Sequence, residues 1–418
     1  MSLMNKQLQP WYASLYRCFA VRSCSTSGGA AHFDSWSCLG KLRRRSERLK
    51  GVLDKLKWLK ISNFQASGQD YPLPMPADQA RSNKSLSQAE LEYAAGFFDG
   101  DGCVATGSGL GGCRLMISQT SDRGEALLLF YGAFGGSIHV QRHGQGSWKP
   151  SITWAVHGRA ARRASALLTE ASFVKKKQLQ IAANWPDCRA ERSKLQAELK
   201  ILKRTPQQVA EFNASWSYAA GFFDAEGYVH IKAADNSVSL GFAQKYVEVL
   251  HHILLCIRNH RPLKGIGIIE VNGQFRLSTW RSATTKYVLK QLLASGLIVK
   301  RRSAEVAMKA TASSHRMARA ANALLAGRQG RYARLTEDGC DRARSIRNMY
   351  SRVVYLRLCS KLHEATMVQQ ELAELRHQHV LLNAQAQYDL PATLRHSLIA
   401  EAGCSHGFCE SDKPRAFE

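Results

Sequence analysis

Acidic residues are scarce in this chain of 418 residues. Lysine and arginine number 58 against 33 aspartates and glutamates, which gives a formal net charge of +25 and a pI near 9.8. An excess of positive charge this large favours a polyanionic partner, with nucleic acid ahead of an anionic membrane surface. The length suits two or three domains with a substantial hydrophobic core.

Long apolar segments and paired cysteines are also lacking. No run of about eighteen apolar residues occurs, so the sequence predicts no transmembrane helix and no membrane partner. The eleven cysteines include no C-x-x-C pair. This scattered arrangement is typical of reduced thiols that fill the core of a protein in a reducing compartment.

The first thirty-three residues contain no aspartate or glutamate. They contain Lys6, Arg17 and Arg22, several serines and scattered apolar side chains, a composition typical of organelle transit peptides. We therefore expect residues 1–40 to direct the protein to the mitochondrion, with the plastid as the alternative. The other interpretation is an unstructured, mildly basic leader without a targeting role.

An internal repeat organises the middle of the chain. Residues 91–102 read LEYAAGFFDGDG and residues 216–227 read WSYAAGFFDAEG, with seven consecutive residues identical. Each residue of the second copy lies 125 positions after its counterpart, as 216 does after 91, and the same offset relates Gln119 to Gln244. Matches that recur at one offset indicate a duplicated domain of roughly 100 residues.

The pattern of apolar and turn residues predicts the same order of elements in each copy. In the first copy we expect a helix near 88–100, strands at 103–106 and 114–120, a helix near 123–133, strands near 136–142 and 151–157, and a helix near 159–170. In the second copy the strands fall near 228–233, 238–244, 265–271 and 274–280. The αββαββα order predicts an α+β fold, in which helices cover one face of a four-stranded antiparallel sheet and the other face is free for a partner.

The segments around the two copies complete the expected organisation. Residues 41–60 read as a basic amphipathic helix, which lies along phosphates or simply presents a solvated face, and residues 66–86 look like a linker. The expected domains are a leader (1–40), a basic helix and linker (41–86), the first copy (87–185), a charged helical linker (186–212), the second copy (213–312), and a helical C-terminal extension with a disordered tail (313–418).

Each repeated motif places a carboxylate at the carboxyl end of its helix. Asp101 precedes Gly102 and Glu226 precedes Gly227, and each glycine is a helix stop. A carboxylate at the negative end of a helix is unfavourable by roughly 0.3–1 kcal/mol unless a cation compensates it. Two hard carboxylates suit Mg²⁺, which prefers oxygen ligands and retains several waters.

Small residues four positions apart occur in both motif helices. These residues are Gly96 and Gly100 in the first helix and Gly221 and Ala225 in the second. Their spacing lets two helix backbones approach closely. If the helices pack together, the two carboxylates converge at the end of a pseudo-twofold interface. Each carboxylate can then serve one strand of a duplex, whose strands are related by such an axis.

The two motifs, Ala94–Gly102 (AAGFFDGDG) and Ala219–Gly227 (AAGFFDAEG), resemble the motif of the LAGLIDADG homing endonucleases in their two-motif, single-chain form. The resemblance covers about residues 88–312 and departs from the family pattern at the first motif position, where alanine replaces leucine. It implies a monomer whose two antiparallel sheets form a saddle over the major groove of double-stranded DNA. It also implies that Asp101 and Glu226 bind the catalytic divalent metal, Mg²⁺.

The resemblance assigns roles to further residues. Gln119 and Gln244 match the polar residue late in the second strand that helps to hold a water at the metal. Lys177 matches the active-site lysine that follows the third helix. The counterpart of Lys177 at the fixed offset is Arg302, with Lys300 close by, so the second active site departs from the family pattern.

The implied reaction is hydrolysis of phosphodiester bonds. Water at the metal attacks phosphorus while the metal and the lysine stabilise the charge of the transition state and of the leaving oxygen. The resemblance implies a mainly structural role for Asp99 and Asp224. Strand side chains would read base edges, and the tentative DNA-contacting residues are Arg114 and Arg142 in the first copy and His230, Lys232 and Arg276 in the second.

Two other functions use the same kind of fold. One is a non-catalytic splicing cofactor (maturase) that binds intron RNA, which suits an organelle leader and long extra termini. The other is a DNA-binding protein derived from an inactive nuclease. The presence of both acids, both glutamines and a matching lysine favours the endonuclease.

Overall fold

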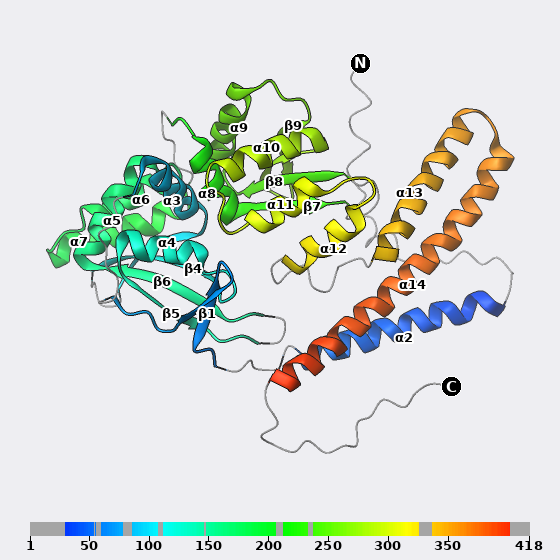
Figure 1. The fold of residues 1–418 in the computed structure, drawn as a ribbon, viewed down its shortest axis with the longest axis horizontal. Helices are drawn as coiled ribbons and strands as arrows, with labels where there is room; N and C mark the ends of the chain where they lie inside the picture. Colours follow the sequence, from blue (N-terminus) through cyan, green and yellow to red (C-terminus); the bar gives the residue numbers. More distant parts are fainter. Residues whose placement is uncertain are drawn as a thin grey trace.

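The structure of the protein is a computed structural model that describes residues 30–53, 55, 60–77, 86–107, 112–145, 148–205, 212–232, 237–325 and 337–401. Most of the expected leader and the expected disordered tail lie outside the described residues. Figure 1 shows two mixed halves of helices and strands side by side, with a group of long helices at one end of the molecule.

The first repeat begins with a motif helix and continues through two β-hairpins. Its elements are α3 (Gln88–Asp101), β3 (Gly102–Thr106), β4 (Cys113–Thr120), α4 (Glu125–Phe134), β5 (Ser137–Arg142), β6 (Ser151–His157), α5 (Gly158–Ala171) and α6 (Lys176–Ala183). All neighbouring strands are antiparallel, in the order β3-β4-β6-β5.

The second repeat has the same order of elements and the same sheet. Its elements are α8 (Trp216–Glu226), β7 (Gly227–Ile231), β8 (Val238–Gln244), α9 (Glu248–His260), β9 (Ile266–Val271), β10 (Gln274–Thr279), α10 (Ser282–Ala294) and α11 (Arg301–Lys309). The strands are again antiparallel, in the order β7-β8-β10-β9. The predicted tandem αββαββα fold is therefore confirmed.

Local sequence explains where the two motif helices begin. Ser87 caps α3 by accepting a hydrogen bond from the backbone N–H of Glu90, and the Glu90 side chain accepts one from the Ser87 backbone in return. Ser215 caps α8 through the backbone N–H of Tyr218 at 3.0 Å. Side-chain caps of this kind contribute about 1 kcal/mol each, because they satisfy N–H groups that lack a partner within the helix.

The two motif helices pack against each other at the centre of the molecule. A Cβ atom on Gly96 would lie 2.1 Å from the carbonyl oxygen of Tyr218, and one on Gly221 would lie 1.9 Å from the carbonyl oxygen of Tyr93. No larger residue fits at either position without moving a backbone. The predicted close approach at the small residues is therefore confirmed, and it follows the pseudo-twofold symmetry of the repeat.

The hydrophobic core runs through both repeats without interruption. The two phenylalanines of each motif, Phe97–Phe98 and Phe222–Phe223, are fully buried. Burial of a side chain of this size contributes roughly 1.5–3 kcal/mol. The core therefore joins the two repeats into one folded body and holds the ends of α3 and α8 in place.

A β-hairpin lies where the sequence predicts the start of a linker. β1 (Asn63–Ala66) and β2 (Gln69–Pro72) pair antiparallel. Phe64 is buried against Gly124 of the first repeat, and the backbone N–H of Gly124 donates to the carbonyl oxygen of Gln65 at 2.8 Å. The prediction of a linker is therefore wrong for this hairpin. The glycine and prolines that follow β1 suggested a linker, but alternate residues of β1 are buried.

Five further helices of the described residues lie outside the two repeats. They are α2 (Ala30–Leu53), α7 (Arg189–Leu202), α12 (His315–Leu325), α13 (Glu337–Leu358) and α14 (Leu362–Glu401). α14 packs on both α13 and α2, so helices from the two ends of the chain form one helical unit. Within the described residues, no helix combines the length and the apolar character that a membrane crossing requires.

Candidate active site

Asp99 and Asp224 join each motif helix to the last helix of its own repeat. Asp99 accepts hydrogen bonds from the backbone N–H groups of residues 173–175 at 2.6, 3.0 and 2.8 Å, just before α6. Asp224 accepts them from residues 298–300 at 2.7, 2.9 and 2.7 Å, just before α11. Both side chains are buried. Their contacts are those of structural residues.

Two tyrosines connect these aspartates across the repeat interface. The hydroxyl of Tyr93 donates to Asp224 at 2.7 Å, and the hydroxyl of Tyr218 donates to Asp99 at 2.7 Å. Burial, reinforced by the facing carboxylate, raises the pKa of each tyrosine well above its usual value. Both hydroxyls therefore remain protonated donors at physiological pH. The sequence does not reveal this role, although both tyrosines belong to the seven identical residues.

Two lysines occupy the carboxyl ends of the motif helices. The Nζ of Lys175 donates to the carbonyl oxygens of residues 98–100 at 2.8, 2.7 and 2.8 Å. The Nζ of Lys300 donates in the same way to residues 223–225. Burial lowers the pKa of each lysine, while Asp99 and Asp224 respectively act to raise it. Each lysine compensates the negative end of a helix.

Asp101 and Glu226 meet at the ends of these helices. Glu226 turns toward the first helix, since its Cγ lies 3.1 Å from the place of a Cβ on Gly100. Asp101 stays in contact with solvent, but the surrounding protein displaces enough water to raise its pKa. Burial also raises the pKa of Glu226, and the charge of Asp101 raises it further. The two carboxylates therefore share one electrostatic site.

The two predicted glutamines differ in their contacts. Gln119 donates through Nε2 to the carboxylate of Asp101 at 2.7 Å. The side-chain oxygen of Gln244 instead accepts the backbone N–H of Lys245 at 2.7 Å. A pocket of about 340 Å³ opens beside Glu226, and Gln244 is one of its lining residues. Both glutamines thus lie at the carboxylate site. Gln119 binds a carboxylate, whereas Gln244 binds the backbone.

The structure keeps the pairing of the cations that the 125-residue offset predicts. Lys300 corresponds to Lys175, because both cap a motif helix. Burial raises the pKa of Asp101 and of Glu226, and the charges of these two lysines partly oppose that increase. Lys177 and Arg302 correspond to each other as the exposed second residues of α6 and α11. The Nζ of Lys300 donates to backbone carbonyl oxygens of its own repeat, and the direct catalytic role of Lys300 stays a prediction. The roles of Lys177 and Arg302 stay predictions.

Three of the five tentative DNA-contacting residues lie on the open faces of the sheets. Arg114 lies between two buried residues of β4, and His230 and Arg276 each precede a buried residue of β7 and β10. Arg142 ends β5 next to a register shift and lies over the Trp148 ring at 6.0 Å. Lys232 follows β7 rather than lying within it.

The guanidinium groups of Arg114 and Arg276 share one feature. The Nε atom of each is buried and has no hydrogen-bond partner among the described residues. An unpaired buried donor is costly, by about 1–3 kcal/mol. Two such donors on the open faces of the two sheets are suitable for an acceptor that comes from outside the protein, such as a phosphate or a base edge.

Comparison with known proteins finds similar solved structures, whereas no family model and no curated protein matches the chain. I-SmaMI bound to an uncleaved DNA target in the presence of calcium ions is 12% identical (57% of this chain, 98% of that chain, TM-score 0.41). The LAGLIDADG meganuclease I-AabMI bound to uncleaved DNA is 14% identical (56%, 97%, 0.38). The I-LtrWI LAGLIDADG homing endonuclease bound to target DNA is 11% identical (56%, 97%, 0.40).

The fold consists of two αββαββα repeats that are joined at their motif helices. Its defining features are the paired motif helices, the two antiparallel sheets of equal strand order, and the two acids where the helices end. These features agree with the fold that the two sequence motifs predict.

Proposed function

We propose that the protein is a site-specific double-stranded DNA endonuclease that hydrolyses one phosphodiester bond in each strand with the help of a divalent metal. The observation that carries this proposal is the meeting of Asp101 and Glu226 at the ends of α3 and α8. The two acids come from opposite sides of a pseudo-twofold interface. This is the symmetry that relates the two strands of a duplex.

The carboxylate site fits Mg²⁺. Within the described part of the chain no group of three or more acidic, histidine or cysteine side chains is placed to hold a metal. Mg²⁺ does not need such a group, because it binds through one or two carboxylates and completes its shell with water and substrate phosphates. Two adjacent carboxylates with raised pKa values are themselves stabilised by a cation. When bound, the metal supplies Lewis-acid stabilisation of the phosphate.

The protein's own groups would position the substrate around this centre. Gln119 fixes the orientation of Asp101 through their hydrogen bond. Lys177 and Arg302, exposed on the first turns of α6 and α11, are the candidates for donors to the phosphate that is cleaved. Arg114 and Arg276 provide unpaired donors on the open faces of the sheets. The chain would act as a monomer, because it contains both repeats.

An RNA-binding splicing cofactor is the second candidate. The observation that favours it is the helical unit of α2, α13 and α14, which lies outside the two repeats and carries a strongly basic helix. Such a cofactor would bind intron RNA and would not need the carboxylates. Under either function we propose that the protein acts in the mitochondrion, or in a plastid, because the first thirty-three residues lack acidic side chains.

Selection of cleaved sequences distinguishes the two candidates. The full chain is incubated with Mg²⁺ and a random library of double-stranded DNA, in parallel with the Asp101→Asn/Glu226→Gln variant. These substitutions remove the charges and keep the shape of the side chains. We expect one family of sequences, cut in both strands, from the wild type only. A folded wild type that cuts nothing and binds RNA in a salt-sensitive way would instead support the splicing cofactor.

A further inference from the structure

α2 has one face that packs and one face that is charged. Leu39 and Ser46 are buried and Leu42 and Leu49 are half-buried. These positions are three and four residues apart, so they lie on one side of the helix. α2 packs against α14, and this side is therefore its packing face.

The opposite side of α2 carries a stripe of positive charge. Lys41, Arg44 and Arg48 are also three and four residues apart, and all three are exposed. None of them makes an ion pair with another described residue. The composition of α2 is one-sided, with six lysines and arginines and two acids. The α2 stripe is thus complementary to a row of phosphates.

The position of the helical unit fits a long duplex. Both views show the unit at the end of the long axis, beyond the second repeat. The two repeats lie side by side along this axis. A duplex that offers one half-site to each repeat runs along the line between them, and so continues toward the unit. The 24 residues of α2 span about 36 Å, close to one helical turn of DNA, or roughly 10 base pairs.

α12 connects this unit to the second repeat. The side-chain amide of Asn322 donates to the carbonyl oxygen of Val229 on the edge strand β7 at 3.3 Å. His315 is buried at the start of α12, where its Nδ1 lies 3.1 Å from the carbonyl oxygen of Ala312. The Asn322 contact holds α12 on the repeat, whereas the His315 contact lies within the turn that begins α12.

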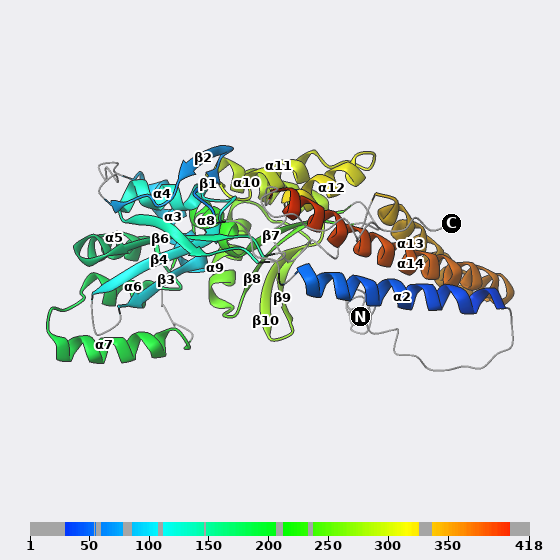
Figure 2. The ribbon, with the colours of Figure 1, turned by 90° about the horizontal axis from the view of Figure 1, so that it is seen from below.

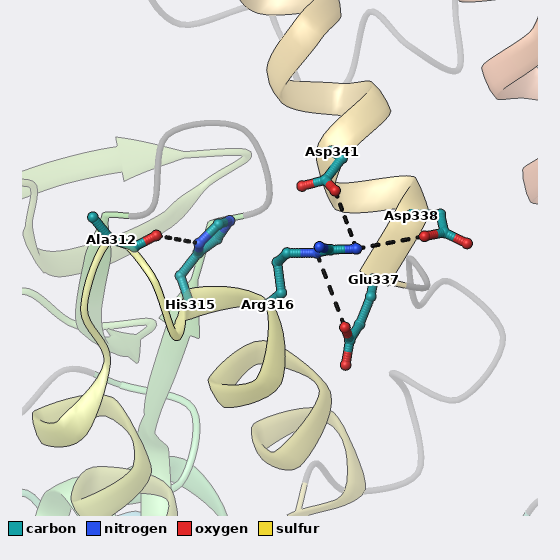
Figure 3. A network of polar contacts seen from close by, with 6 residues as sticks. All are labelled: Ala312, His315, Arg316, Glu337, Asp338 and Asp341. Atoms are coloured by element: carbon teal, nitrogen blue, oxygen red, sulfur yellow. Dashed lines mark hydrogen bonds and ion pairs between the residues drawn. The ribbon is translucent and has the colours of Figure 1, made fainter.

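Arg316 extends this attachment to α13, as Figure 3 shows. Its guanidinium lies 3.9, 3.4 and 3.1 Å from carboxylate oxygens of Glu337, Asp338 and Asp341, respectively. One cation with three carboxylates in different directions fixes the first turn of α13 more firmly than a single surface ion pair does. The contact restrains the orientation of α13, and through α14 that of α2.

We propose that α2 is a second DNA-binding element, in which Lys41, Arg44 and Arg48 contact phosphates of the duplex that flanks the target site on the side of the second repeat. Arg316 is the positioning residue that keeps α2 in line with this duplex. The proposal rests on the proposed function for its ligand, double-stranded DNA. It does not depend on cleavage.

The test compares two triple variants of the full chain. Lys41→Gln/Arg44→Gln/Arg48→Gln removes the stripe, and Arg189→Gln/Lys194→Gln/Lys200→Gln removes three exposed cations of α7 as a matched control. Binding is measured against salt on two duplexes of random sequence. The shorter duplex spans the two repeats, and the longer one extends it by roughly one helical turn. Circular dichroism shows whether each variant is folded.

We expect the wild type to bind the longer duplex more tightly and with a steeper salt dependence. The α2 variant should lose this gain, with the slope reduced by up to about 2.7 for three phosphate contacts, at about 0.9 per contact. The α7 control should keep the gain. Arg316→Gln, which leaves the stripe intact, should reduce the gain without abolishing it.

Three outcomes would overturn the proposal. One is an α2 variant that binds the longer duplex as the wild type does. Another is an equal loss in the α2 and α7 variants, because that would be a general effect of net charge. The third is an α2 variant that loses affinity for a structured RNA and not for the duplex. If the wild type binds neither duplex, the proposed DNA endonuclease fails as well. If the wild type binds both duplexes and the α2 variant binds them equally well, this inference fails and the proposed function stands.

Discussion

The two repeats share a scaffold and differ where the carboxylates lie. In both, an aspartate of the motif helix accepts three backbone amides of its own repeat and one tyrosine hydroxyl of the other. In both, a lysine caps the motif helix. These symmetric contacts stabilise the fold. The two repeats therefore share the same residues where folding depends on them.

The two repeats differ at the glutamines and at the charged residues around the carboxylates. Arg123, whose charge lowers the pKa of Lys300, has Glu248 as its counterpart 125 positions later, and Glu248 lines the pocket beside Glu226. Lys203, from the end of the connecting helix α7, lines the same pocket. The Asp101 end and the Glu226 end therefore present different charges to the two strands of a duplex.

Substitution of the interface glycines should have the largest effect on stability. A Cβ at Gly96 or Gly221 would lie 2.1 or 1.9 Å, respectively, from a backbone oxygen of the other helix, far inside van der Waals contact. We expect Gly96→Ala and Gly221→Ala each to destabilise the fold by about 3 kcal/mol or more, as measured by urea unfolding. Similar losses are expected from both. A mild effect at one glycine would contradict the symmetric interface.

Removal of the tyrosine hydroxyls comes next. Tyr93→Phe and Tyr218→Phe each leave a buried aspartate with one hydrogen bond fewer, for an expected loss of about 1–3 kcal/mol. The same unfolding experiment measures it. Tyr71→Phe, whose hydroxyl bonds only an exposed glutamine in its own hairpin, is the control and should change little. Unequal losses of stability at Tyr93 and Tyr218 would show that the two equivalent hydrogen bonds do not contribute equally to the fold.

Substitution of the two glutamines should lower the cleavage activity by unequal amounts. Gln119→Ala removes the group that orients Asp101, and an effect on cleavage of roughly 10–100-fold is expected for such a contact. Gln244→Ala should cost less, since the Gln244 side chain bonds its own neighbour. Single-turnover cleavage of a selected target, resolved by strand, measures both. Equal effects would mean that the two ends act alike when DNA is bound.

The smallest expected effect is on pH-dependent stability. The raised pKa values of Asp101 and Glu226 mean that protonation favours the folded state, so their ionisation lowers stability as pH rises through the folded pKa. The Asp101→Asn/Glu226→Gln variant should therefore melt at a higher temperature than the wild type at pH 7. The difference should disappear below about pH 4, where the unfolded carboxyls are also protonated. Mg²⁺ should raise the melting temperature of the wild type only, and a variant that melts lower at pH 7 would contradict this reasoning.

The sequence predicts most of the central architecture because the signal is duplicated. Identical motif residues, small residues at helical spacing and two alternating hairpins in each copy identify the helix pair and the sheets. The same repetition brings Asp101 and Glu226 together. The 125-residue offset also pairs Lys175 with Lys300, but it does not show that these lysines cap the motif helices.

Other features depend on contacts between distant segments. The hairpin of β1 and β2 has only four residues in each strand, and it is stabilised by Phe64 packing on Gly124. Tyr93 and Tyr218 look like core residues until the helices are placed side by side. Nothing in the local pattern of α2 indicates that it packs on α14, from the other end of the chain. These features follow from tertiary packing, which single-sequence periodicity does not encode.

Strand-resolved cleavage by single-acid variants is the sharpest test of the claim that each repeat supplies one carboxylate to one strand. A supercoiled plasmid with a selected target is incubated with Mg²⁺ and with wild type, Asp101→Asn, Glu226→Gln or the double variant. The symmetric assignment predicts linear product from the wild type, nicked circles cut in opposite strands from the two single variants, and no product from the double variant. Linear product from the double variant would contradict the assignment of Asp101 and Glu226 as the catalytic pair.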